Sequence, residues 1–321
     1  MKRQISTILA ALMLTGCMTA CSGKPIGDPD KLQIVTTIFP EYDWVMNVLG
    51  DKAGDAEVTM LLDKQVDMHS YQPTTEDIVV ISTCDVFIYV GGESDAWVED
   101  ALDQATNGDM VVVNLMDELG DAVREEETVE GMEAGESEDE DEIEYDEHVW
   151  LSLRNAGVLV NSIAAALAEA DPDNADTYAG NAASYNDELA ALDSEYQSLI
   201  DGAPTKTLLF GDRFPFRYLV EDYDLSYYAA FAGCSAETEA SFKTITFLAG
   251  KVDELSLDTV LVIENSDDGI ARTIIENTGS GDAQILTLDS MQSVTLDDYK
   301  NGTTYLSIMR SNLSVLEQAL Y

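Results

Sequence analysis

The stretch DPDNADTYAGNAASYNDELAALDSEYQSLID, residues 171–201, decides how the chain is organised. Asp171 is a suitable helix N-cap, and Pro172 suits a first helical turn. Large apolar side chains then recur at steps of three, four and seven: Tyr178, Tyr185, Leu189, Leu192, Tyr196 and Leu199. A helix of about thirty residues is roughly 45 Å long. We therefore expect one long rigid helix whose apolar stripe packs against the rest of the protein.

On both sides of this helix, short apolar runs alternate with helical patterns. Four runs precede it, at 32–37, 56–62, 85–91 and 109–117, and four follow it, at 206–212, 225–233, 259–265 and 284–289. Their continuous apolar character is typical of parallel strands that are covered on both faces. We therefore predict an α/β fold with two Rossmann-like (β/α)4 lobes, joined by the long rigid helix.

This pattern divides the chain into segments. The predicted boundaries are a lipoprotein signal peptide (1–16), a flexible tether (17–30), an N-terminal lobe (31–155), a linking helical region (156–203) and a C-terminal lobe (204–321). Ligands of open α/β sheets bind beyond the carboxyl ends of the strands. A binding site is therefore expected beyond the carboxyl ends of the strands.

The N-terminus has the features of an export signal. Lys2 and Arg3 precede an apolar stretch that is too short to span a bilayer comfortably. Leu14-Thr15-Gly16-Cys17 resembles a bacterial lipobox, in which the cysteine receives the lipid. We expect an extracytoplasmic protein that is anchored to the cell membrane through lipid at Cys17.

The chain is strongly acidic, with 62 Asp and Glu residues against 16 Lys and Arg and a formal net charge of −46. Such a charge argues against nucleic-acid binding, because phosphates need basic side chains to neutralise them, and it favours cations. Residues 118–147 are especially acidic and contain one basic side chain, Arg124. We expect a disordered loop there. It is either simply solvated or raises the local cation concentration.

Two cysteines of the mature chain follow apolar runs. In an oxidising compartment, Cys84 and Cys234 form a disulfide or remain two buried free thiols. Pairing cannot be deduced from sequence, so both options stay open.

Four potential metal ligands lie beyond the predicted strands. The only two histidines, His69 and His148, follow the second and fourth strands. Asp212 and Asp289 stand at the ends of the fifth and eighth. Two imidazoles and two carboxylates can complete a closed shell around one divalent transition metal ion.

Further polar residues are candidates for supporting these ligands. A neutral imidazole ligand needs a hydrogen-bond acceptor on its other nitrogen, and Asp67 and Asp146 are close in sequence to the histidines. Glu264 ends the seventh strand and is either a second acceptor or a substitute ligand. Arg213 follows Asp212 and could neutralise excess carboxylate charge in the cleft.

Several motifs together resemble a known family: VDMHSYQPTTEDI (66–78), DEHVWLSLRNA (146–156) and ADPDNADTYAGNAASY (170–185). They are similar to the zinc- and manganese-binding lipoproteins of bacterial ABC importers, the ZnuA/TroA-like cluster. The resemblance extends from about residue 32 to the end of the chain. It implies two lobes joined by a rigid helix and one metal ion in the cleft. It also implies delivery of that ion to a membrane permease with no chemical step.

The resemblance assigns ligands residue by residue. His69 and His148 match the first two family ligands, and Asp289 matches the fourth, acidic one. Asp212 stands at the third position, which is usually His in zinc carriers and Glu in many manganese carriers. Asp is shorter than either, so the cleft closes further or a water fills the gap. The expected cargo is one ion, Zn²⁺ or Mn²⁺, and the choice between them stays open.

Two other functions are compatible with these residues. An acidic surface adhesin or cation-sequestering protein would depend on residues 118–147 rather than on a pocket. A zinc hydrolase would need an open coordination position, and four protein ligands leave none. We therefore expect a monomeric binding protein that is not an enzyme.

Overall fold

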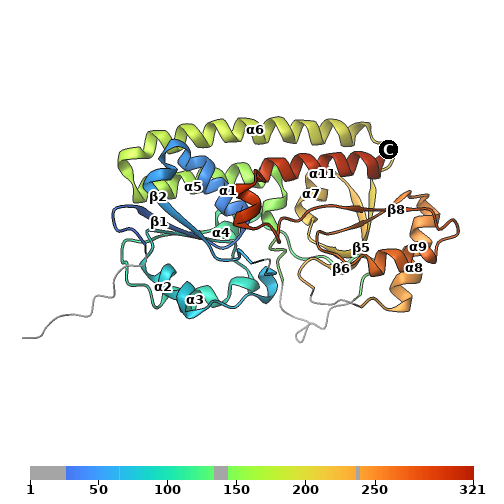
Figure 1. The fold of residues 1–321 in the computed structure, drawn as a ribbon. Helices are drawn as coiled ribbons and strands as arrows, with labels where there is room; N and C mark the ends of the chain where they lie inside the picture. Colours follow the sequence, from blue (N-terminus) through green and yellow to red (C-terminus); the bar gives the residue numbers. More distant parts are fainter. Residues whose placement is uncertain (1–26, 65, 134–143, 236–238) are drawn as a thin grey trace, which may run out of the picture.

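The computed structural model describes residues 27–64, 66–133, 144–235 and 239–321, which form two lobes (Figure 1). The predicted signal peptide, the lipidation residue Cys17 and most of the tether lie outside the described residues.

The N-terminal lobe is built on a four-stranded parallel sheet with the order β2-β1-β3-β4. Its strands are Leu32–Thr36 (β1), Ala56–Met60 (β2), Val86–Tyr89 (β3) and Val111–Asn114 (β4). Its helices are Phe39–Leu49 (α1), Thr75–Thr83 (α2), Trp97–Leu102 (α3), Leu115–Leu119 (α4) and Leu153–Ala170 (α5). Helices α2 and α3 cover one face, and α1 and α5 cover the other (Figure 1).

The C-terminal lobe repeats the same strand order, β6-β5-β7-β8, again with parallel pairing. Its strands are Thr207–Phe214 (β5), Ser226–Ala232 (β6), Thr259–Val262 (β7) and Gln284–Thr287 (β8). Its helices are Arg217–Asp222 (α7), Phe242–Leu255 (α8), Gly269–Glu276 (α9), Leu296–Lys300 (α10) and Tyr305–Leu320 (α11). The two-lobe α/β prediction and its eight strands are confirmed.

Single turns of 3-10 helix connect several of these elements. They are Gly50–Asp55 (η1), Met68–Ser70 (η2), Glu93–Asp95 (η3), Gly120–Ala122 (η4), Val149–Leu151 (η5) and Pro172–Asn174 (η6). Three of them, η2, η3 and η5, occur in loops that contribute to the candidate site described below.

The long helix predicted from the opening stretch is α6, Ala175–Gly202, with 28 residues. It lies alongside α5 and α11 and extends over both lobes (Figure 1). The Tyr185 hydroxyl donates to Asp43 of α1 at 3.1 Å, in the N-terminal lobe. The Tyr196 hydroxyl donates to the carbonyl of Met309 in α11 at 2.6 Å. The apolar stripe therefore fastens one helix to both halves of the molecule.

The largest apolar core is continuous between the lobes. It includes Ile34 and Trp44 from the N-terminal lobe, Leu192 from α6, and Leu208 and Leu316 from the C-terminal lobe. Lobes that move freely usually share only a small, polar interface. A shared apolar core instead favours a stiff frame, so we expect a site that forms with small movements.

The acidic segment 118–147 has more defined structure than its composition predicts. Residues 134–143 lie outside the described part of the chain. On either side of them, Glu125 and Tyr145 pair in an antiparallel bridge. Arg217 of the C-terminal lobe lies 2.7 Å from a carboxylate of the segment. The prediction of disorder is therefore wrong for both flanks, because main-chain pairing and an arginine from the other lobe offset the repulsion among the acids.

Candidate metal centre

His148 is held rigidly at the end of the acidic segment. Its ring is fully buried. The Oδ1 atom of Asp146 accepts the main-chain N–H of His148 at 2.8 Å and lies 3.0 Å from Nδ1 of the ring. Next to it, the Trp150 indole donates to the carbonyl of Ser290 in the C-terminal lobe at 2.9 Å. Asp146 therefore contacts both the main chain and the ring of His148.

His69 is positioned by a different set of groups. Asp67 caps the turn η2 by accepting the main-chain N–H of His69 at 3.1 Å. The Nδ1 atom of the His69 ring lies 2.8 Å from Ser94 Oγ and 3.3 Å from Glu147 Oε2. Ser94 in turn donates to Glu147 at 2.5 Å. The ring is thus oriented by Ser94 and Glu147, whereas Asp67 contacts only its main chain.

Glu147 is an ionised carboxylate that lies next to Nδ1 of the His69 ring. Burial raises the pKa of Glu147, but hydrogen bonds from His69 and from the side chain and main chain of Ser94 outweigh it. The net effect is a pKa below the ordinary value. A carboxylate that accepts the ring N–H at Nδ1 fixes the orientation of the ring and the tautomer whose Nε2 can bind a metal.

The two imidazoles face each other with their Nε2 atoms 3.2 Å apart. We assign the Nδ1–H tautomer to both rings, because each Nδ1 lies on an acceptor. Both Nε2 lone pairs then point into the same space. Two nitrogens bound to one tetrahedral zinc ion at about 2.0–2.1 Å lie roughly 3.3–3.4 Å apart. The pair therefore has the spacing of two ligands that share one ion.

A third potential ligand, Cys234, joins the histidines from the C-terminal lobe. One nitrogen of each ring and the Cys234 sulfur all lie within 4.8 Å of one another. Burial raises the pKa of the Cys234 thiol, and the negative charges of Glu126 and Asp146 raise it further. The thiol is therefore protonated when no cation is nearby.

Gly233 brings this cysteine close to the histidine. A Cβ atom at Gly233 would lie 3.1 Å from Cε1 of His148 and 2.9 Å from the carbonyl oxygen of Phe214. Such distances are tighter than ordinary van der Waals contact. Because Gly233 has no side chain, the turn after β6 can pack directly against the His148 ring.

Asp212 lies at an irregularity inside β5 rather than at its end. The pairing register between β5 and β6 shifts between Phe210 and Arg213, and Asp212 falls in this interval. Its Oδ1 accepts the Arg213 N–H at 2.8 Å, whereas its Oδ2 is buried and has no hydrogen-bond partner among the residues that the structure describes. Asp212 lines the same cavity as His69. A buried carboxylate oxygen without a partner is costly and is relieved by a cation.

Asp289 and Glu264 lie side by side in the C-terminal lobe. Asp289 accepts the Met291 N–H at 2.7 Å. Burial and the charge of Glu264 raise the pKa of Asp289 to about 6. Glu264 accepts hydrogen bonds from the N–H and hydroxyl of Ser290 at 2.7 and 2.8 Å, and lines the cavity with His69. Among the described residues, neither Asp212 nor Asp289 belongs to the close cluster of His69, His148 and Cys234.

Arg213 links the two lobes at the edge of this cavity. Its Nη2 lies 2.7 Å from Oδ2 of Asp67. Burial raises the pKa of Asp67, but the charge and hydrogen bond of Arg213 outweigh it and leave the pKa below its usual value. Arg213 therefore compensates the charge of Asp67 through an ion pair between the lobes.

Sequence reasoning did not identify Glu147, Ser94 or the position of Cys234. Ser94 follows β3 and Cys234 follows β6, so both lie beyond carboxyl ends of parallel strands, where open sheets bind ligands. Applying that rule to every strand would have included them.

Both described cysteines are free thiols, so the disulfide option is not realised. Cys84 is buried in the N-terminal lobe, where its sulfur donates to the carbonyl of Ile81 at 3.2 Å. Cys234 lies at the cleft, within reach of the histidines. The two sulfurs therefore have different neighbours: Cys84 Sγ lies 3.5 Å from the Met110 sulfur, whereas Cys234 lies beside the histidines.

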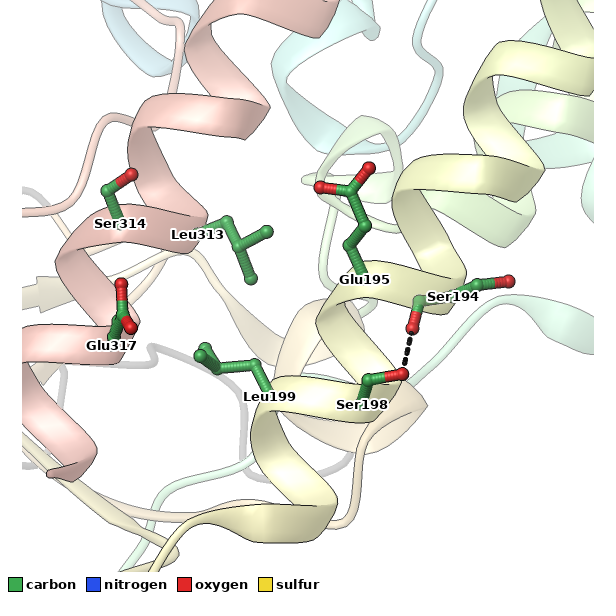
Figure 2. A pocket seen from close by; sticks show the side chains of 7 residues that line it. All are labelled: Ser194, Glu195, Ser198, Leu199, Leu313, Ser314 and Glu317. Atoms are coloured by element: carbon green, nitrogen blue, oxygen red, sulfur yellow. Dashed lines mark hydrogen bonds between the residues drawn. The ribbon is translucent and has the colours of Figure 1, made fainter.

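A second hollow lies between α6 and α11, away from the histidines (Figure 2). It is lined by Ser194, Glu195, Ser198, Leu199, Leu313, Ser314 and Glu317. Glu195 is 3.7 Å from the guanidinium of Arg310. With neither imidazole nor thiol in its lining, this hollow lacks the nitrogen and sulfur donors that favour zinc.

The chain is similar to bacterial metal-binding proteins in sequence and in fold. The family described as zinc-uptake complex component A, periplasmic (ZnuA), matches residues 34–319. The zinc-binding lipoprotein AdcA of Streptococcus pneumoniae is 32% identical over 98% of this chain and 61% of that protein. The high-affinity zinc uptake system protein ZnuA of Bacillus subtilis is 29% identical over 98% of this chain and 96% of that protein.

A solved structure agrees with this similarity. The Zn(II)-bound ZnuA-like domain of Streptococcus pneumoniae AdcA superposes with a TM-score of 0.70 at 28% identity, covering 90% of this chain and 99% of that one. The chain spans about three fifths of the length of the AdcA relatives that it matches.

Proposed function

Because this chain belongs to the ZnuA family of zinc-uptake components, we propose that it captures one divalent transition metal ion between its lobes and delivers it to the permease of an ABC importer. One observation carries the proposal. Two imidazoles from distant parts of the chain present Nε2 atoms 3.2 Å apart, and each ring has an acceptor on its Nδ1. Such a pair is preorganised to bind a metal.

The proposed ligands come from both lobes. His69 and His148 belong to the N-terminal lobe, and Asp212 and Asp289 belong to the C-terminal lobe. The unpartnered Oδ2 of Asp212 supports its role, since a cation in the shared cavity would satisfy it. Two neighbouring half-buried acids, Asp289 and Glu264, also favour a nearby cation. The metal then joins the lobes, and the closed form is what the permease recognises.

Zinc is the proposed cargo, and manganese is the alternative. The relatives of this chain are named as zinc-binding or zinc-uptake proteins. Zn²⁺ also binds a given set of nitrogen and oxygen donors more tightly than Mn²⁺. We propose a carrier rather than an enzyme, because a filled ligand shell leaves no position for an activated water.

We also propose that the protein is anchored outside the cytoplasm by lipid on Cys17. The Streptococcus pneumoniae relative is named a lipoprotein. Within the described ranges, no helix is long and apolar enough to cross a bilayer. Labelling cells with a fatty-acid analogue tests the anchor, because Cys17→Ser should lose the label and release the protein from the membrane.

The function is tested by metal content and metal competition. Purified protein should contain one equivalent of zinc by mass spectrometry, and Zn²⁺ should displace Mn²⁺. His69→Ala and His148→Ala should abolish tight binding, whereas the control Glu317→Gln, in the hollow between α6 and α11, should not. Tight binding that persists in both histidine variants would refute the proposal.

The acidic segment provides the competing interpretation, cation sequestration without a pocket. Replacing the six acids between residues 134 and 143 with Asn and Gln keeps the length of the segment. The pocket proposal expects one tight metal equivalent to persist in this variant. Loss of that equivalent would favour sequestration by the acids.

A further inference from the structure

We propose that the Cys234 thiolate is itself a metal ligand, and that its sulfur makes the site select zinc over manganese. The inference rests on the proposed function, because it concerns the same cleft. The residues that cluster with the two histidines differ from the ligands that the sequence predicted. In the part of the chain that the structure describes, the side chain that joins both histidines in one close cluster of potential ligands is the Cys234 thiol, not Asp212 or Asp289.

The geometry is close to that of a bound zinc ion. A tetrahedral zinc ion with sulfur at about 2.3 Å and nitrogen at about 2.0–2.1 Å places these two atoms roughly 3.5–3.6 Å apart. Here the cysteine sulfur and one nitrogen of each ring are all within 4.8 Å. A shift of about 1 Å is therefore enough to bring the sulfur into the coordination sphere.

Two contacts of the residues around Cys234 keep its sulfur close to the histidines. On one side, Gly233 lies against the ring of His148. On the other, the main-chain N–H of Cys234 donates to Glu126 Oε1 at 3.0 Å. The turn after β6 is thus tied to the acidic segment that also carries the histidine. Its cysteine is one of the two free thiols in the described chain, and the other is buried in the N-terminal lobe.

The chemistry of the donors then determines the cargo. On binding, the thiol loses one proton to solvent and the sulfur forms a bond to the metal, so the site gains a unit negative charge. Thiolate is a soft donor that favours zinc, whereas manganese prefers carboxylate, carbonyl and water oxygens. Two imidazoles, one thiolate and one carboxylate such as Asp212 would leave a bound divalent ion electrically neutral.

Cobalt(II) provides a direct test on the unmodified protein. A Co²⁺–thiolate bond gives a strong charge-transfer absorption in the near ultraviolet, which imidazole and carboxylate ligands do not produce. Wild-type protein titrated with Co²⁺ should show this band, saturating at one equivalent. It should disappear in Cys234→Ser and remain in Cys84→Ser, the matched control. Its absence from the wild-type protein would overturn the proposal without reliance on any variant.

Competition measurements test the selectivity. Cys234→Ser should weaken zinc binding by at least about 10- to 100-fold, the loss that removal of an outer-shell partner already causes. Manganese binding should change little, so the preference for zinc falls. Unchanged zinc affinity in Cys234→Ser, together with loss in His148→Ala, would reject the thiolate but keep the proposed carrier. Unchanged affinity in both variants would reject the carrier itself.

Discussion

Tyr185→Phe is expected to destabilise the protein more at about pH 8 than at about pH 5. The Tyr185 hydroxyl donates to Oδ2 of Asp43 at 3.1 Å, where α6 packs on α1. Asp43 is fully buried. Burial raises the pKa of Asp43 from 3.8 to about 6, although hydrogen bonds from Tyr185 and from the main chain of Tyr305 lower it.

The sign of the pH dependence follows from this raised pKa. Because the pKa in the folded state exceeds the unfolded value, the stability contributed by Asp43 is complete below pH 3.8 and is lost as the pH rises through about 6. A shift of about two pKa units corresponds to about 3 kcal/mol. Above that range the buried carboxylate is ionised and depends on its remaining donors, of which Tyr185 is one.

The size of the effect follows from the charge of the acceptor. A hydrogen bond to a charged group contributes about 1.5–3 kcal/mol, and a neutral one contributes about 0.5–1.5 kcal/mol. Tyr185→Phe should therefore lower the free energy of unfolding by about 1.5–3 kcal/mol at the higher pH. At the lower pH, where Asp43 is protonated, the loss should be about 1 kcal/mol.

Urea denaturation measures the loss in the free energy of unfolding at both pH values, and a chelator removes any stabilisation by bound metal. Tyr178→Phe is the matched control, because Tyr178 lies on the same helix and donates to Asp171 at 2.6 Å. Burial raises the pKa of Asp171, but hydrogen bonds from Tyr178 and Asn174 outweigh it and keep it below its ordinary value. The control should lose equal stability at both pH values. An equal loss for Tyr185→Phe, or a larger one at low pH, would refute the reasoning.

Three further predictions concern the cleft. Asp146→Ala removes the acceptor that orients the His148 ring and should weaken zinc binding about 10- to 100-fold in a competition titration. Gly233→Ala places a methyl group 3.1 Å from the His148 ring, and isothermal titration calorimetry should show weaker zinc binding with a folded circular dichroism spectrum. Arg213→Ala breaks the ion pair with Asp67 between the lobes and should speed zinc release to a chelator in stopped-flow measurements, more strongly at low salt than at high salt.

Much of the fold could be predicted from the sequence because its signals are local. The β3 run is apolar throughout, and its residues Val86, Phe87 and Ile88 are completely buried, as continuous burial on both faces requires. The apolar stripe of α6 likewise followed from spacing alone, since a helix has a fixed period. The flanks of the acidic segment were predicted wrongly, because the charged residues that pair with them, Glu221 and Arg217, come from a distant part of the chain.

The candidate site was predictable only in part. His69 and His148 stood out because the chain has no other histidine. Glu147 was harder to find, since it follows another acid and only its contacts with Ser94 and the His69 ring distinguish it. The place of Asp212 inside β5 depends on a shift of strand register, which no local pattern shows.

By itself, the sequence determined that the protein has two sheets of parallel strands and one long helix that joins the lobes. It also determined that the two histidines follow strands of the N-terminal lobe. Those features depend on periodicity, burial and residue type, which are properties of short stretches. Only the tertiary structure decided which side chains meet. The distance between the Nε2 atoms, the contact of Gly233 with His148 and the approach of Cys234 join segments about eighty residues apart or more. Their geometry is set by how the two lobes pack on a shared core, and no short stretch of sequence contains that information.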